Sequence, residues 1–345
     1  MSEKKLLLIS FDYELFLGEK SGTVRECLID PTDHLIACLG RFAFKAVFFI
    51  DTVYILHLKE IAEKYEAAKT DLDSIIAQLV KLVKSGHEIQ PHIHPHWMDA
   101  IYHPESNEWN LSEKKHYTLA SLSDDQQSRL FNESVSFLKS VLEMANANQP
   151  IDSYRAGGWS IQPFEKFRPW FIRYGIKNEW SVIPGKYQIS DAHGFDFREA
   201  PIERKIYRFD TDPCHSNANG PFTEWTISSI TMNRFEKWMD FKVSGLLRRL
   251  GKRPAFKGKT VSSVITEQGD NRIRKNQKRI IASFEGLNPF TLRKYFSAIR
   301  KARYFQFISH PKLISPYEFT MIEKLFTKLK KGNNIKTDFR EAIPG

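Results

Sequence analysis

The sequence predicts an α/β fold in the form of a distorted (β/α) barrel of about seven strands. Short, continuously apolar runs such as KLLLISF (5–11) and FKAVFFID (44–51) are typical of strands covered on both faces. Segments whose apolar residues have helical spacing separate such runs along most of the chain. This alternation implies parallel strands, and the number of strand–helix units favours a barrel over an open sheet.

The first half of the chain contains the clearest elements. Residues 71–86 place apolar side chains at the i, i+3, i+4 and i+7 positions of one helix face, and Gly86 stands where a glycine commonly ends a helix. Ser123 and Gln126 have the spacing of a capping box. The strands expected here are 5–11, 44–51 and 87–94, and the helices are 31–42, 71–86 and 121–145.

The second half continues the alternation within the same domain. We expect a single catalytic domain over 1–345, with a polar insertion at 99–120, a basic insertion at 232–285 and a C-terminal tail at 332–345. The strands expected here are 150–158, 176–183, 224–230 and 304–310, and the helices are 161–175, 289–302 and 316–331.

Composition indicates a globular chain with a substantial core. Apolar residues make up 41% of it and aromatic residues 13%, so global disorder is not expected. The apolar run at 6–10 is too short for a signal-peptide core, and no stretch is long enough to span a membrane, so we expect a cytoplasmic protein. The three cysteines are an odd number without framework spacing, which indicates reduced thiols.

The net charge of +10 is unevenly distributed, because Lys and Arg are concentrated between residues 241 and 305. One interpretation is a solvated basic face. The other is attraction to an anionic partner, either a phosphate-bearing glycolipid or a membrane surface that the protein contacts peripherally. No nucleic-acid-binding motif stands out, so nucleic acid is not an expected partner.

Polar side chains close several of the predicted strands. In an α/β barrel the chemistry is found where strands end and loops begin, so these residues are candidates for one site. The stretch GHEIQPHIHPHW (86–97) alone holds four of the chain's eleven histidines. The candidates are Asp12, Glu14, His92, His94, His96, Arg155 and His310.

Spacing predicts how some of these residues cooperate. His92 and His96 are four apart, so one helical turn would put both on one face, and two histidines with one carboxylate form a common catalytic metal site. His94 alternates with them and is expected to point away. Asp12 and Glu14 are two apart on an extended segment and project the same way, so one can bind metal while the other acts as a base.

The order FDYE, GHEIQPHIHPH, YRAGG and FISHP resembles the polysaccharide deacetylase family, carbohydrate esterase family four. The resemblance runs from about residue 5 to 312, and it implies a distorted barrel and a divalent metal, expected to be zinc. It implies His92 and His96 as metal ligands, and Glu14 as the third ligand because some branches of the family have an Asp-x-Glu first motif. It also implies Asp12 as the catalytic base, Arg155 beside it and His310 as the general acid. The alternative is that Asp12 binds the metal and another group is the base.

The chain departs from the family pattern at three places. Tyr13 replaces the second aspartate of the first motif, and Ala156-Gly157-Gly158 replaces a proline motif. The acidic residue that tunes the late histidine has no clean match; Glu179 is the first expectation and Asp212 the second. The residues expected to contact substrate are Tyr13, Gly157, Trp159 and Trp180.

The resemblance implies a hydrolase of carbon–nitrogen bonds other than peptide bonds. The expected reaction removes N-acetyl (or O-acetyl) groups from a sugar in a cell-surface polysaccharide or glycolipid precursor, and the acetylated sugar could be phosphate- or lipid-linked. One alternative is an amidohydrolase of the same barrel that acts on a small cyclic ureide or imide. The other is a metal-free carbohydrate-binding homologue.

Overall fold

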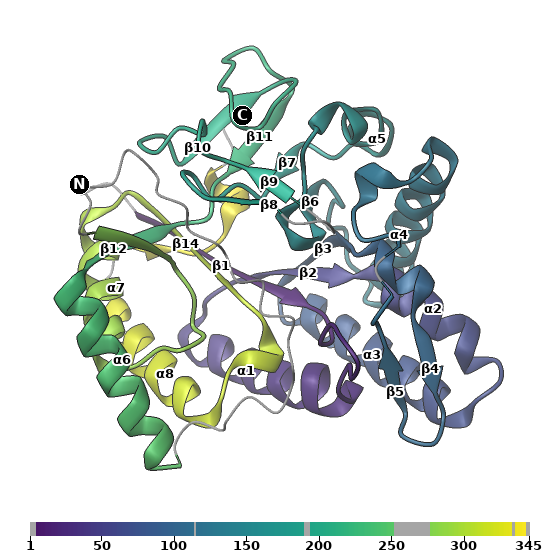
Figure 1. The fold of residues 1–345 in the computed structure, drawn as a ribbon, viewed down its shortest axis with the longest axis horizontal. Helices are drawn as coiled ribbons and strands as arrows, with labels where there is room; N and C mark the ends of the chain where they lie inside the picture. Colours follow the sequence, from purple (N-terminus) through teal and green to yellow (C-terminus); the bar gives the residue numbers. More distant parts are fainter. Residues whose placement is uncertain (1–4, 114, 190–193, 252–276, 333–334, 343–345) are drawn as a thin grey trace.

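A nine-stranded sheet curls around the centre of the molecule, as the computed structural model shows (Figure 1). The structure describes residues 5–113, 115–189, 194–251, 277–332 and 335–342. Most of the basic stretch, 252–276, therefore lies outside the described residues. In spatial order the strands are β10 (Ile206–Phe209), β11 (Phe222–Trp225), β7 (Asn178–Glu179), β6 (Ser153–Ala156), β3 (Glu88–Ile93), β2 (Val47–Asp51), β1 (Lys5–Tyr13) and β14 (Tyr304–Ser309), with β15 (Ile335–Lys336) beside the start of β1.

The run from β11 through β7, β6, β3, β2 and β1 to β14 is parallel throughout. Single backbone hydrogen bonds then bridge β14 back towards β7. Ile308 N donates to Ala282 O (3.0 Å), Ala282 N donates to Ser228 O (2.8 Å), and Ile227 N donates to Val182 O (2.9 Å). The sheet is therefore an irregular, barrel-like form, which confirms the predicted fold class.

Helices cover the outside of the sheet, and several of their ends match the sequence patterns. Ser123 caps its helix in a capping box with Gln126, as predicted, and Gly86 adopts φ +76° just beyond the end of α3. The segment expected as a helix at 161–175 is helical only from Arg168, after a short 3₁₀ turn. The helices of the described chain are α1 (Asp30–Phe42), α2 (Thr52–Ala62), α3 (Glu66–Lys84), α4 (Asp124–Met144), α5 (Arg168–Tyr174), α6 (Arg234–Arg249), α7 (Pro289–Lys301) and α8 (Pro316–Lys330).

Alternation along each strand divides the buried residues into two cores. On β1, Leu7, Ile9 and Phe11 face the helices, whereas Leu6 and Leu8 face the inside of the barrel. The inner core is smaller and mostly aromatic. It consists of Leu6, Leu8, Val47, Phe49, Trp180, Trp225, Tyr304 and Phe339.

The tail predicted at 332–345 contributes to this inner core where it is described. Phe339 is 2% exposed and packs edge-on against Trp180 and Trp225. The next residue, Arg340, pairs with Glu88 (2.6 Å) and Asp152 (2.7 Å). This segment therefore closes the end of the barrel where β1 begins.

The two insertions form separate small elements. The polar insertion at 99–120 contains the hairpin of β4 (Ile101–His103) and β5 (Glu108–Asn110). The excursion between Ser228 and Ala282 contains β12 (Ser229–Asn233), α6 and β13 (Gln277–Ile281). A further antiparallel pair consists of β8 (Tyr187–Ile189) and β9 (Gly194–Asp196). None of the helices in the described ranges has the length and apolarity needed to cross a membrane.

Candidate functional site

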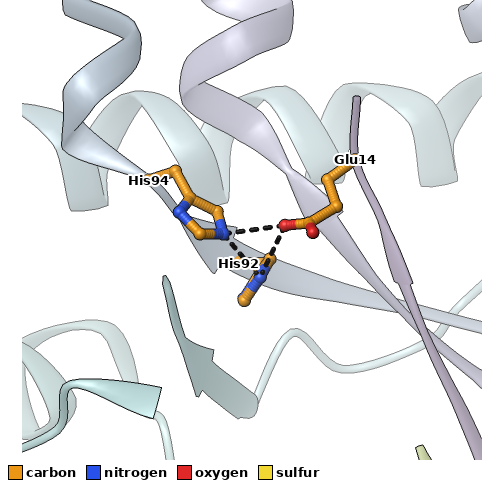
Figure 2. A group of neighbouring side chains, drawn as sticks. All are labelled: Glu14, His92 and His94. Carbon is orange, nitrogen blue, oxygen red and sulfur yellow. Dashed lines mark hydrogen bonds and ion pairs between the residues drawn. The ribbon is translucent and has the colours of Figure 1, made fainter. Parts of the chain in front are cut away.

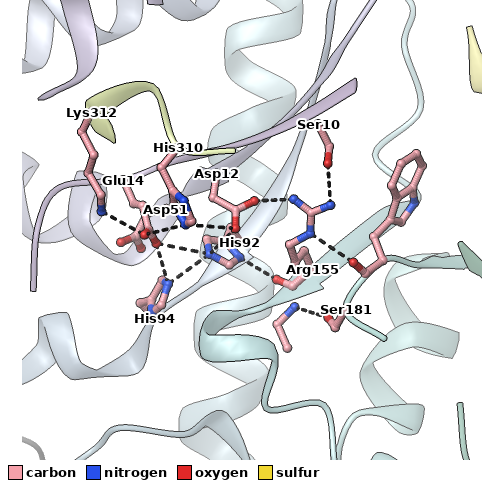
Figure 3. Close-up of polar contacts among 12 residues, drawn as sticks. Ser10, Asp12, Glu14, Asp51, His92, His94, Arg155, Ser181, His310 and Lys312 are labelled. Atoms are coloured by element: carbon pink, nitrogen blue, oxygen red, sulfur yellow. Dashed lines mark hydrogen bonds and ion pairs between the residues drawn. The ribbon is translucent and has the colours of Figure 1, made fainter. Parts of the chain in front are cut away.

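The candidate site lies at the carboxyl ends of the central parallel strands (Figure 3). Sheet register places its residues at one level, because Asp51 is the partner of His92 across β2 and β3, and His92 is the partner of Arg155 across β3 and β6. Asp12 is the penultimate residue of β1, and His310 directly follows β14. The structure therefore brings together Asp12, His92, Arg155 and His310, four of the residues predicted from sequence, at one end of the barrel.

Asp12 forms a buried ion pair with Arg155, as predicted. The Arg155 side chain is fully buried, and it also donates from Nη2 to Ser10 Oγ (2.7 Å) and from Nε to Trp180 O (3.1 Å). Burial alone would raise the pKa of Asp12, but Arg155, followed by His92, holds that pKa below its ordinary value. Asp12 is therefore an ionised carboxylate with one oxygen fixed by Arg155.

Glu14, His92 and His94 form a compact cluster of possible metal ligands (Figure 2). Glu14 Oε2 lies 2.8 Å from His94 Nε2 and 3.4 Å from His92 Nε2, and the two imidazole nitrogens are 3.0 Å apart. All three side chains are buried. The structure thus favours Glu14 over Asp12 as the carboxylate of this cluster.

The inclusion of His94 corrects the expectation that its side chain points away. His92 lies on β3, and the backbone stays extended through His94 (φ −112°, ψ 94°). In an extended chain residues two apart share a face, so His92 and His94 point the same way. The helical spacing used for His92 and His96 does not apply to residues that lie on a strand.

His96 belongs to a 3₁₀ turn (Pro95–Asp99) and lies just outside this cluster. Its ring stacks on Tyr117 from the polar insertion, with centroids 5.5 Å apart. Within the described chain neither of its buried ring nitrogens has a hydrogen-bond partner. Burial, followed by the charge of His94, lowers its pKa well below the ordinary value. Its predicted role as a ligand stays a prediction.

His310 is placed to donate a proton, and its partner is Glu285. His310 Nδ1 and its backbone N both lie 2.8 Å from Glu285 Oε1, and its Nε2 lies 3.6 Å from Asp12 Oδ2. Burial would lower the pKa of His310, but Glu285 outweighs it and raises that pKa to about 9. The side chain is 22% exposed, so a substrate can approach it.

The expected partners of His310, Glu179 and Asp212, were wrong. Glu179 is fully buried, and its carboxylate accepts hydrogen bonds from Ser181. Asp212 pairs instead with the exposed His215 (3.1 Å). Glu285 was missed because it is the last residue of the predicted basic insertion (232–285), where no motif marks it. An acidic residue at the end of that basic stretch was the available signal.

Two more charged groups at the site were missed. Asp51 ends β2 and accepts a hydrogen bond from Trp97 Nε1 (2.5 Å) through one oxygen, while its other oxygen has no partner in the described structure. Burial raises the pKa of Asp51 to about 6, against the opposing effect of His94. Lys312 reaches Glu14 Oε1 at 2.9 Å. Asp51 could have been found, because it closes a predicted strand as Asp12 does.

The cluster fits a divalent metal ion by the chemistry of its donors. His92 Nδ1 lies 2.8 Å from Arg155 O, so it donates its proton there and leaves Nε2 free as a ligand atom. Burial would raise the pKa of Glu14, but Lys312, followed by His94, holds it well below the ordinary value, so it is a carboxylate. Two imidazoles and one carboxylate are the ligands typical of catalytic zinc sites.

The four residues expected to contact substrate fall into two groups. Tyr13 and Trp180 are buried in the protein core; the Tyr13 hydroxyl donates to Gln78 Oε1 (2.8 Å), and Trp180 stacks on Trp225, so for these two the expectation was wrong. Gly157 adjoins the site, because an added Cβ there would lie 2.8 Å from His94 Nδ1. Trp159 is partly buried and packs edge-on against Phe195, and its contact with substrate stays a prediction.

Comparison with solved structures identifies the fold. A protein from Mycobacterium smegmatis that is described as a polysaccharide deacetylase aligns over 99% of this chain and 90% of its own, with a TM-score of 0.50 and 11% identity. This chain has the polysaccharide deacetylase fold. A polysaccharide deacetylase from Bacillus cereus aligns over 97% of this chain and 91% of its own (TM-score 0.41, 10% identity). A family 4 carbohydrate esterase from Streptomyces lividans aligns over 97% of this chain and 93% of its own (TM-score 0.39, 10% identity).

Searches by sequence matched no family model and no curated protein. The deacetylase fold of this chain is therefore visible in its three-dimensional arrangement and not in overall sequence similarity. At 11% identity the likeness establishes the fold alone, and the chemistry has to be argued from the residues at the carboxyl ends of the strands.

Proposed function

We propose that this protein is a metal-dependent hydrolase that removes acetyl groups from a sugar. One observation carries the proposal. His310 Nε2 lies 3.6 Å from Asp12 Oδ2 and 3.4 Å from Glu14 Oε1, so a cationic imidazole faces both an ionised carboxylate and the candidate metal cluster. A base, an acid and a metal site that converge in this way are the parts needed for metal-assisted amide or ester hydrolysis.

Glu14, His92 and His94 are the residues that would hold the ion, and their chemistry is that of a zinc site. When bound, such an ion polarises a carbonyl oxygen and lowers the pKa of water towards about 7. Lys312 already neutralises part of the Glu14 charge, since its Nζ lies 2.9 Å from Glu14 Oε1. The carboxylate therefore stays ionised in the buried cluster whether or not an ion is present.

Asp12 would accept the proton of the attacking water. Arg155 fixes one of its oxygens and keeps it ionised, while the other oxygen faces His310 and His92. A base held in this way has a defined direction for proton transfer, and general acid–base help of this kind is worth roughly 10²–10⁴-fold in rate. The ion pair with Arg155 thus serves the orientation of the base as well as its charge.

His310 would protonate the leaving amine or alcohol. Glu285 accepts from its Nδ1, which leaves Nε2 directed at the site, and the raised pKa of about 9 keeps the ring protonated near neutral pH. The products would be acetate and a deacetylated sugar. The aligned Mycobacterium smegmatis protein is described as a polysaccharide deacetylase, which supports an acetylated sugar as the substrate. We propose that this sugar belongs to a cell-surface polysaccharide or glycolipid precursor.

Acetate release tests the proposal directly. Zinc-loaded protein should release acetate from an N-acetylglucosamine oligomer or from an O-acetylated xylan, and the Asp12→Asn variant should release almost none. The sugar class is wrong if the wild-type protein releases no acetate but opens a cyclic imide or ureide. If the protein binds sugar oligomers but binds no metal and releases no acetate, it is a carbohydrate-binding homologue.

The cytoplasmic location stays a prediction, which cell fractionation would test.

A further inference from the structure

Helix α6 (Arg234–Arg249) carries an exposed apolar surface at the periphery of the molecule, at the lower left of Figure 1. Among the residues that the structure describes, nine large apolar side chains are exposed, and five of them lie on this helix or directly after it. Their exposed fractions run from 51% for Trp238 to 67% for Phe235. These five are Phe235, Trp238, Phe241, Leu246 and Leu250.

Basic side chains share this surface. Lys242 Nζ lies 5.6 Å from the centre of the Trp238 ring, and the ring of Phe235 lies 5.9 Å from that of Trp238. At the carboxyl end of the helix, Arg248 and Arg249 are also exposed. Aromatic and positively charged groups therefore alternate over the same face of the helix.

The two acidic residues of α6 are engaged with other parts of the protein. Glu236 pairs with Lys294 of α7 (2.6 Å) and closes the capping box with Asn233. Asp240 accepts a hydrogen bond from Asn288 Nδ2 (2.6 Å). Their charges are thus directed towards α7, and the outer face keeps a net positive charge beside its apolar side chains.

We propose that α6 docks on an anionic lipid membrane surface. A helix with aromatic and leucine side chains on one face, interleaved with Lys and Arg, lies in the membrane interface with its apolar side chains among the lipid headgroups. The basic residues add attraction to anionic lipids. The sequence beyond the helix, KRPAFKGK and NRIRKNQKR, has the same sign of charge, which favours an anionic surface over a neutral protein partner.

The contact would be peripheral, because no helix of the described chain is suited to span a bilayer. The basic excursion is also close to the site in sequence, since Ala282 ends that excursion three residues before Glu285, the partner of His310. The inference stands apart from the proposed hydrolysis, because binding to vesicles is measured without any substrate.

Co-sedimentation of the full-length protein with vesicles tests the inference. The wild-type protein should bind vesicles of phosphatidylcholine with phosphatidylglycerol more tightly than vesicles of phosphatidylcholine alone, and added salt should weaken that binding. Phe235→Ser with Phe241→Ser should reduce the binding at least about tenfold. The matched control is Met144→Ser with Ile172→Ser, which alters side chains of similar exposure away from α6 and should leave binding unchanged.

A charge variant separates the electrostatic part. Arg248→Gln with Arg249→Gln should weaken binding to the anionic vesicles by roughly tenfold or more at low salt, since each charge near the surface contributes about fivefold. Lys59→Gln with Lys64→Gln, two exposed lysines on or just after α2, should have little effect. The melting temperature of each variant checks that it is folded.

Three outcomes would overturn the inference. The first is an absence of wild-type binding to the anionic vesicles, and the second is equal loss of binding in the α6 variants and their controls. The third is a dimer in sedimentation velocity that Phe235→Ser with Phe241→Ser dissociates while vesicle binding is absent, which would assign this face to a second copy of the chain.

Discussion

The two ends of the barrel are built by the same strands and carry different kinds of side chain. Where the strands begin, the inner residues are apolar: Leu6 and Leu8 on β1 and Tyr304 on β14 pack in the inner core. Where they end, the same inward face carries Asp12 on β1 and His310 after β14. The inward face changes from apolar to polar over a few residues. Ser10 on β1 and Arg155 on β6 mark this change, and their side chains are hydrogen-bonded to each other.

The aromatic end therefore contributes to the stability of the fold, and the polar end holds the reactive groups. The aromatic end buries apolar area around Trp180, Trp225 and Phe339, which stabilises the fold. The other end buries charges, which is costly unless each is paired, and here Arg155, Lys312 and Glu285 are the partners of the reactive groups. Substitutions at the two ends should therefore change different measured quantities.

The largest effect is expected at the polar end. Asp12→Asn removes the charge that accepts the proton but keeps an oxygen for Arg155, so kcat for acetate release should fall by roughly 10²–10⁴-fold. Metal content should stay at the wild-type level, because Asp12 is outside the Glu14–His92–His94 cluster. If Asp12→Asn loses the metal while Glu14→Ala remains active, the roles of the two carboxylates are reversed.

At the aromatic end the effect should be on stability. Phe339→Ala removes a 2% exposed ring that packs on Trp180 and Trp225, so the free energy of unfolding in urea should fall by about 3–5 kcal/mol. The metal content of the folded variant should not change. Phe241→Ala is the control, because that ring is 66% exposed and its loss should cost less than about 0.5 kcal/mol. A Phe339→Ala protein of normal stability that has lost its metal would contradict this division.

A smaller effect is expected on the pH dependence of activity. Glu285→Gln keeps an oxygen to accept from His310 but removes the negative charge that raises the pKa of His310 to about 9. Without that charge the protonated ring is less stabilised, so its pKa falls and the basic limb of the pH–rate curve moves to lower pH. Asp212→Asn is the control and should leave the limb in place. If the basic limb moves with Asp212→Asn and not with Glu285→Gln, Asp212 is the acidic residue that tunes His310, which was the second expectation from sequence.

The last effect concerns the pH dependence of stability and two buried carboxyl groups, Glu179 and Glu224. Burial, followed by the charge of Glu179, raises the pKa of Glu224 well above its ordinary value, so the folded protein keeps a proton that the unfolded chain releases. Stability should then decrease as pH rises above the ordinary carboxyl range, by up to about 1.4 kcal/mol per pH unit. Glu224→Gln should flatten the fall in melting temperature between pH 5 and pH 8. An unchanged slope in this variant would show that Glu224 is already ionised in the folded protein.

Pattern analysis predicted the α/β class, the barrel and most strands of the nine-stranded sheet, because buried parallel strands and amphipathic helices leave strong periodic signals. It missed α2 and α6 for opposite reasons. α2 (TVYILHLKEIA) follows β2 almost without a turn, and half of its length is buried, so its polar face is short. α6 exposes its aromatic residues, so its pattern lacks the ordinary division into buried apolar and exposed polar faces.

At the site, the residues on strands were predicted better than their partners from loops. Asp12, Glu14, His92 and Arg155 follow from strand ends and from the motifs, and the structure brings them together. His94 was misplaced because helical spacing was applied to an extended segment. Glu285 and Lys312 reach the site from loops around β14, and their positions depend on how those loops fold, which local spacing does not encode.

The metal content of two single-histidine variants tests the central claim most directly. The wild-type protein should bind about one divalent ion per chain, measured by elemental analysis after exposure to zinc. His94→Ala should lose the ion, because His94 Nε2 faces Glu14 at 2.8 Å, whereas His96→Ala should retain it, because His96 is outside the Glu14–His92–His94 cluster. Retention in His94→Ala with loss in His96→Ala would contradict the structural assignment and support the ligand pair implied by the sequence motif.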